Sequence, residues 1–100
     1  MADYLARSVN GVAIRLTEER WQHIVRVHPE MADKRADIRE AIELADSVHE
    51  GRGGALVAVR RMDRLYLTVV YREIGENDGF VISSYLTRRP GTRRIVWRRN

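Results

Sequence analysis

Histidine is the side chain that titrates nearest to neutral pH, and two of the chain's three histidines fall within residues 17–30. That stretch contains His23 and His28 together with Arg20 and Arg26. A base, an acid and a guanidinium group can together cleave RNA. The base activates the 2′-OH, the acid protonates the leaving oxygen, and the arginine stabilises the charged phosphate. RNA supplies its own nucleophile, so these residue types favour phosphodiester chemistry without a metal ion.

The two histidines fall on different sides of the helix predicted for this stretch. One buried stripe with i, i+3, i+4, i+7 spacing is formed by Trp21, Ile24, Val25 and His28. His23 lies about 140° around the helix from His28, so it points away from the stripe. Pro29 disfavours a helical His28, and the helix should therefore end at residue 27 or 28. This break could bring His28 back toward His23, or His28 could serve as a helix-end cap or a core residue.

Other kinds of catalytic site lack their characteristic residues. The chain has no cysteine, which excludes disulfides, thiolate chemistry and Cys-based zinc sites. There is no His-x-x-x-His spacing, no Gly-x-Ser-x-Gly turn and no Gly-x-x-x-x-Gly-Lys loop. We therefore expect no metal site and no cofactor, and a site made of His, Arg, Tyr and Thr. His49 falls in the turn region after the second predicted helix and is given no role.

The first half of the sequence predicts a hairpin and two helices. Asn10-Gly11 between short apolar runs indicates a type I′ turn within residues 5–16. Thr17 is the expected cap of the first helix. A second helix is predicted over residues 33–45, with Asp33 as its cap. Its buried stripe is expected to be Ile38, Ala41, Ile42 and Ala45.

The second half predicts an antiparallel meander. Residues 55–61, 65–72 and 80–87 alternate with period two and are rich in Val, Ile, Leu and Tyr. The face that receives the helices is expected to carry Val57, Val59, Leu65, Leu67, Val69, Phe80, Ile82 and Leu86. The opposite, polar face is expected to carry Arg60, Tyr66, Thr68, Ser83, Tyr85 and Thr87. The fold class is therefore α+β, with an N-terminal hairpin or strand and two helices packed on one face of the meander.

Charge is distributed unevenly along the chain. Residues 1–87 carry twelve basic and fourteen acidic groups, a net charge of −2, whereas residues 88–100 carry six arginines and no acid. Clustered guanidinium groups suit phosphate, although a solvated tail or one paired with acids on the helices also accounts for the pattern. We predict one domain over residues 1–87 and an Arg-rich tail over residues 88–100. Residues 95–97 could form a short final strand or dock on the core.

No run of residues is long and apolar enough to span a membrane, and the N-terminus has no signal-peptide pattern. A cytoplasmic location with no membrane partner is therefore expected.

Three short motifs carry a resemblance to a known group of proteins. They are Leu16-Thr-Glu-Glu-Arg-Trp-Gln-His-Ile followed by His28-Pro-Glu, Ala45-Asp46-x-Val48, and Tyr85-Leu-Thr87. The pattern resembles the small phage- and mobile-element-associated nuclease families grouped with barnase, EndoU, colicin ribonucleases and RelE-type toxins, the BECR fold. The resemblance covers roughly residues 12–90. It implies two helices on an antiparallel sheet and metal-independent cleavage of RNA.

The resemblance also implies where the site lies. In those families a basic or His residue of the first helix and a Ser or Thr of the last strand face the substrate. Here these positions are matched by His23 or His28 and by Thr87, the catalytic candidates, with Arg60 or Arg88 as phosphate partners.

Four further residues are expected to bind the RNA. Arg20 and Arg26 lie beside His23 on the predicted helix. Aromatic residues on an open sheet face can stack splayed bases, which makes Tyr66 and Tyr85 candidates for base contacts.

Two hypotheses of different kinds follow. The first is a small endoribonuclease, such as a toxin with a cognate antitoxin or immunity partner. The second is a non-catalytic module of the same fold that binds nucleic acid or protein, in which the histidines are structural and the Arg-rich tail supplies salt-sensitive binding. A homodimer that uses residues 95–97 as an edge strand is a further possibility.

Overall fold

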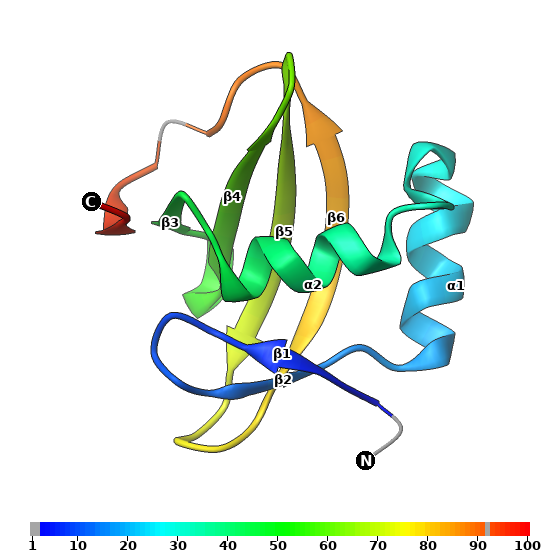
Figure 1. Cartoon of the computed structure of the whole chain (residues 1–100). Coiled ribbons are helices and arrows are strands. Elements are labelled where there is room, and N and C mark those ends of the chain that lie inside the picture. The colour runs from blue at the N-terminus through cyan, green and yellow to red at the C-terminus, as the bar shows by residue number, and fades with distance from the viewer. Residues whose placement is uncertain (1–2, 92) are drawn as a thin grey trace.

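A curled, mixed sheet wraps around helix α2 in the computed structural model, which describes residues 3–91 and 93–100 (Figure 1). The helices and strands are β1 (Tyr4–Arg7), β2 (Ala13–Arg15), α1 (Glu18–Val27), α2 (Arg35–Glu43), β3 (Ser47–Glu50), β4 (Leu56–Met62), β5 (Leu65–Glu73), β6 (Gly79–Thr87) and β7 (Ile95–Arg98). The strand order is β1-β2-β6-β5-β4-β3-β7, with β2 and β6 parallel and the other neighbours antiparallel. The α+β class, the N-terminal hairpin, the two helices and the meander β4-β5-β6 are confirmed.

The N-terminal hairpin turns differently from the prediction. Gly11 has a φ of +78° and its N–H donates to Ser8 O at 2.9 Å, but Asn10 has no positive φ. A type I′ turn needs positive φ at both central residues, so the type I′ prediction is wrong. The hydroxyl of Ser8 instead holds the turn: it accepts from Asn10 N at 3.3 Å and donates to Glu73 Oε2 at 2.5 Å.

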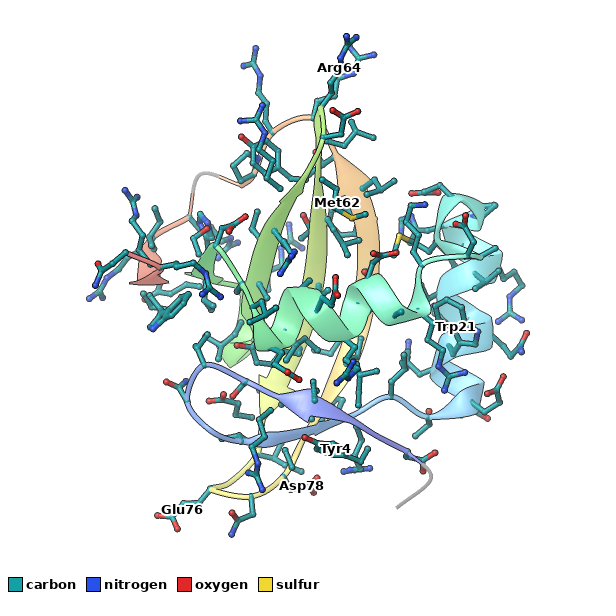
Figure 2. All side chains as sticks on the ribbon, in the orientation of Figure 1. Tyr4, Trp21, Met62, Arg64, Glu76 and Asp78 are labelled. Carbon is teal, nitrogen blue, oxygen red and sulfur yellow. The ribbon has the colours of Figure 1, made fainter. Side chains whose placement is uncertain are left out.

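Helix α1 begins and ends as predicted. Thr17 Oγ1 accepts from Arg20 N at 3.1 Å, which satisfies one of the free N–H groups of the first turn. His28 is the C-cap, with φ −126° and ψ 79°, in accord with the proline that follows it. Ile24 is fully buried, while the guanidinium of Arg35 lies 5.5 Å from the centre of the Trp21 ring at the junction of the two helices (Figure 2).

Helix α2 starts two residues later than expected. Asp33 binds Lys34 Nζ at 3.0 Å instead of capping the helix, so the predicted cap is wrong. The predicted stripe Ile38, Ala41, Ile42 and Ala45 is confirmed, and each of these residues is at most 1% exposed. The helix crosses the sheet and packs against β5, β1 and β4 (Figure 1).

The inner face of the sheet, which α2 covers, is defined by core residues of the meander. They are Ala58, Leu67, Val69, Tyr71, Val81 and Ser84. Alternation from Ala58 places Val57 and Val59 on the opposite, outer face, so their predicted face is wrong.

The same correction applies to the first half of β6. Phe80 pairs with Arg72 and lies on the outer face. Ile82 also lies on the outer face, and it has no partner on β5 because it is the extra residue of a bulge between Val81 and Ser83. A bulge adds one residue and shifts the alternation that follows it. Leu65, Leu67, Val69 and Leu86 share the inner face, which α2 covers, so their common face is as predicted.

Two edge regions complete the sheet. Strand β3 was not predicted, and it carries His49 at 5% exposure. Strand β7 pairs with β3, so residues 95–98 form the short final strand. The two turns of the meander lie at opposite ends of the sheet (Figure 2). The turn between β4 and β5 carries Arg64, and the turn between β5 and β6 carries Glu76 and Asp78. Within the described residues, no helix has the length and apolarity needed to cross a membrane.

Candidate functional site

His28 directly follows the last residue of α1, and its ring lies against Tyr85 in the C-terminal half of β6. Its ring centroid is 5.4 Å from that of Tyr85, and the two rings are tilted by 37°. Its Nδ1 is 3.8 Å from Glu30 Oε2, with 30% of the histidine side chain exposed. The non-helical backbone at His28 is what places its ring there, since the helix ends at Val27. His28 therefore has both a carboxylate and a phenol ring as neighbours while remaining accessible to solvent.

Two cross-strand pairs of the outer face extend this arrangement. Tyr66 of β5 is paired with Thr87 of β6, and the next pair on the same face is Thr68 with Tyr85. We call His28, Tyr66, Tyr85 and Thr87 the outer-face cluster. All four were predicted from the sequence as site residues, and the structure brings them to one region of the sheet.

Several contacts restrain the outer-face cluster. The guanidinium of Arg61 lies 5.9 Å from the centre of the Tyr66 ring. Thr87 Oγ1 donates to Arg89 O at 3.0 Å, where the chain leaves β6. Arg88 and Arg89 follow directly and are both exposed, so guanidinium groups are available beside the cluster.

His23 lies in a different place, which we call the α1 hollow. It has a volume of about 700 Å³ and is lined by Arg15, Thr17, Glu19, Arg20, Gln22, His23, Arg26, Phe80 and Val81. Arg26 Nη2 is 3.3 Å from His23 Nδ1, and because arginine can only donate, Nδ1 accepts and the ring proton is on Nε2. The predicted group of His23, Arg20 and Arg26 is thus found together, but apart from His28.

Arg15, which lines the α1 hollow, forms a bidentate ion pair with Asp78. Arg15 Nε and Nη2 bind the two carboxylate oxygens of Asp78 at 2.8 and 3.1 Å. The hydrogen bond from Arg15 lowers the pKa of Asp78, and the same bond raises the pKa of Arg15. Arg15 is therefore already partnered, so Arg20 and Arg26 are the better candidates to bind an anion here.

Arg60 is not part of either region. It belongs to the inner face, and its Nη1 donates to Leu44 O at 3.2 Å, at the C-terminal end of α2. A cation is favourable at that end of a helix dipole. The prediction that Arg60 lies on the polar face beside Tyr66 is therefore wrong.

A third region, which sequence reasoning did not predict, lies on the outer face next to the cluster. This outer hollow has a volume of about 560 Å³ and is lined by His49, Glu50, Gly51, Arg52, Ala55, Val57, Thr68, Val70, Ile82, Tyr85, Thr87, Arg89, Gly91 and Arg93. Its residues come from four strands, from the loop between β3 and β4, and from the chain after β6. The unrecognised strand β3 and the unforeseen bulge in β6 explain why its composition was missed.

His49 is fixed in the wall of the outer hollow. Its Nδ1 is 3.2 Å from the carbonyl oxygen of Arg93 and therefore carries the proton, while Nε2 lies 3.0 Å from Ser47 Oγ and can accept from it. Both ring nitrogens are thus used within the protein. The signal in the sequence was Ser47-Val-His-Glu50, a short alternating run before a Gly-rich loop.

Metal chemistry has no evident ligand set in the described part of the chain. Residues 3–91 and 93–100 contain no group of three or more His, Asp or Glu side chains placed to hold an ion. What the two histidine regions do offer is imidazole, phenol, hydroxyl and guanidinium groups on an accessible surface.

Comparisons with protein-family models, with curated proteins and with solved structures find no significant match.

Proposed function

We propose that the protein is a metal-independent endoribonuclease whose reaction takes place at the outer-face cluster. The observation that carries the proposal is the placement of the His28 ring against Tyr85, on the face that also presents Thr87 and Tyr66. These residues come from the end of α1 and from two central strands. They are also the residue types that RNA transesterification needs.

His28 is proposed as the acid–base group. In the cleavage step the 2′-oxygen of RNA bonds to phosphorus and the bond from phosphorus to the 5′-oxygen breaks. The base removes the 2′-OH proton, and an acid returns a proton to the 5′-oxygen, leaving a 2′,3′-cyclic phosphate. Glu30, 3.8 Å from His28 Nδ1, lies close enough to stabilise the protonated imidazole, and the phenol of Tyr85, whose ring lies against that of His28, is proposed as the second proton donor.

Positive charge for the phosphate comes from the residues that follow β6. Arg88 and Arg89 are exposed directly after Thr87, so a phosphate bound at the cluster can be contacted by either guanidinium group. Tyr66 offers an aromatic surface for a neighbouring base.

The α1 hollow is proposed to bind a more distant phosphate of the same strand. Phe80 lines that hollow and Tyr85 belongs to the cluster, so the two regions are five residues apart on β6, or roughly 16 Å. His23, Arg20 and Arg26 then guide the RNA backbone instead of acting on the reacting phosphate.

We also propose a biological role, that of a toxin, and this part rests on the resemblance to toxin-type ribonucleases. A toxin-type ribonuclease that acts in the cytoplasm needs a cognate antitoxin or immunity partner. An acidic partner could bind the exposed arginines beside the cluster, Arg88 and Arg89.

Strand β7 is an edge strand with Ile95 and Val96 exposed, and this edge is available for pairing with a second copy.

One observation favours a non-catalytic alternative. Thr87 Oγ1 donates its proton to Arg89 O, so the hydroxyl already has a local structural role. In this alternative the cluster and the arginines bind RNA without cleaving it, and binding falls with salt as counterions compete for the phosphates.

The proposal is tested by incubating the pure protein with single-stranded RNA in EDTA. Wild type is compared with His28→Asn and with Val27→Asn, a matched control that puts the same side chain at an exposed neighbouring position. We expect cleavage by wild type and by the control, and at least a hundredfold loss for His28→Asn. Absence of cleavage with retained, salt-sensitive binding would establish the non-catalytic alternative.

A further inference from the structure

The outer hollow has the make-up of a small-molecule site, with an apolar floor and a charged rim. Val57, Val70 and Ile82 supply aliphatic side chains from three adjacent strands. Its volume of about 560 Å³ lies within the range typical of ligand sites, on the order of 300–1,000 Å³. Tyr85 lines the hollow and also contacts His28, so the hollow adjoins the proposed reaction centre.

Thr68 gives the hollow an unpartnered polar group. It is 3% exposed and lies on the central strand β5 between Val59 and Tyr85. Its Oγ1 is buried and has no hydrogen-bond partner among the described residues. Leaving a buried hydroxyl unpaired is costly, so such a group in a folded protein calls for an explanation, and a ligand that bonds it is one. Its backbone carbonyl, in contrast, accepts from Ser84 Oγ at 2.9 Å.

The rim of the outer hollow is mostly positive. Arg52, Arg89 and Arg93 line it and are exposed. The acid at the rim, Glu50, is paired with Arg94 at 3.5 Å. The occupant should therefore have an apolar, flat part for the floor, a group that bonds a hydroxyl, and a negative charge at the rim.

We infer that the outer hollow binds one nucleobase of single-stranded RNA, next to the phosphate that is cleaved. The base lies on Val57, Val70 and Ile82 beside Tyr85, and the adjoining phosphate meets the rim arginines. Rotation of the Thr68 side chain about χ1 brings its unpaired hydroxyl to the base. A base has hydrogen-bonding groups on its edge and apolar faces, which matches this lining. The inference rests on the proposed function for the identity of the RNA, and it makes Thr68 a specificity-determining residue.

The test is a methyl NMR titration of the full-length protein with each of the four nucleoside 5′-monophosphates and, separately, with inorganic phosphate. We expect saturable shifts of the Val57, Val70 and Ile82 methyl signals with at least one nucleotide and none with phosphate alone. Val27, exposed on α1, is the internal control and should not move. Absence of such shifts, or equal shifts with phosphate alone, would overturn the inference.

Two variants sharpen the titration. Thr68→Val keeps the shape of the side chain and should weaken nucleotide binding about fivefold to tenfold. Arg89→Gln should weaken it about as much, whereas Arg39→Gln, an exposed arginine of α2 paired with Glu43, should not. Unchanged affinity in both Thr68→Val and Arg89→Gln would remove the hollow as the binding site.

The nuclease proposal and the base site fail separately. Cleavage of RNA without any methyl shift removes the base site and leaves the nuclease. Methyl shifts in a protein that does not cleave RNA leave the base site and remove the nuclease.

Discussion

The inner and outer faces of the sheet are built from the same three strands, but they differ in what fills them. On the inner face Leu67, Val69 and Tyr71 are at most 1% exposed under α2. On the outer face only Val59 and Thr68 are buried to a similar degree, whereas Tyr66, Thr87 and the aliphatic residues that these strands contribute to the outer hollow are half-buried. The difference indicates that the inner face determines the fold, so the polar groups of the outer face are available for another task.

The largest expected effect is the loss of RNA cleavage when His28, next to the outer face, is replaced. His28→Asn should lower the rate of RNA cleavage by about 10²–10⁴-fold, because it removes the proposed acid–base group. It should leave the free energy of unfolding within about 1 kcal/mol of wild type, since the side chain is partly exposed. Cleavage kinetics and chemical denaturation together measure the two effects.

His23 provides the contrast within the same helix. His23→Asn should change cleavage by less than about tenfold, and the change should appear in KM and depend on salt. A loss as large as that of His28→Asn, seen in kcat, would move the reaction to the α1 hollow.

The next largest effect is the loss of stability expected when a core residue of the inner face is truncated. Leu67→Ala should lower the free energy of unfolding by about 3 kcal/mol, because it leaves a cavity in a fully buried site. Val70→Ala, its outer-face counterpart on β5, should cost less than half as much because Val70 is only half-buried. Equal costs in urea denaturation would contradict the assignment of the core to the inner face.

A smaller effect of opposite sign is expected at Thr68. Thr68→Val should raise the free energy of unfolding by about 1 kcal/mol, because it replaces a buried unpaired hydroxyl with a methyl group. A gain in stability together with weaker nucleotide binding is the combination expected of a ligand-binding residue. Loss of stability would mean that the hydroxyl has a partner in solution.

The smallest effect concerns the ion pair of Arg15 and Asp78 near the α1 hollow. The hydrogen bond from Arg15 lowers the folded-state pKa of Asp78, so its stabilising contribution is present above the unfolded pKa of about 3.9 and is lost as pH falls through the lowered value. Asp78→Asn should therefore be slightly less stable than wild type at neutral pH, with the gap closing as pH falls below about 4. Both side chains are exposed, so high salt should also reduce the gap.

Local rules predicted much of the fold. The Thr17 cap, the Pro29 stop and the stripe around Ile42 each follow from the residues next to them in the chain, and the structure confirms all three. The sheet faces were harder, because β4 is apolar on both sides and the larger valines were assigned to the core in place of Ala58. The bulge at Ile82 then changed the alternation in β6, which no local rule reveals.

The sequence predicted which residue types form the candidate site better than it predicted which of these residues lie together. His28, Tyr66 and Tyr85 were chosen for their chemistry and Thr87 from the resemblance, and the helix break and strand register place the four together. Arg60 was assigned to the wrong face because its position depends on which side of β4 meets α2. His49 and the rim arginines belong to a hollow that depends on two pairings of β3: a local one with β4, which was missed because β3 was not recognised as a strand, and a long-range one with β7, which spacing along the chain does not encode.

The central claim is tested most directly by the chemistry of the products. Wild-type protein is incubated with single-stranded RNA in EDTA, and the new ends are analysed by mass spectrometry. A nuclease in which the 2′-OH attacks must leave 5′-hydroxyl ends together with 2′,3′-cyclic phosphate ends, or with the 3′-phosphate ends that form when water opens the cyclic ester. None of these should form at a position whose 2′-OH is methylated. Cleavage that leaves 3′-hydroxyl ends, or no cleavage at all, would contradict the account.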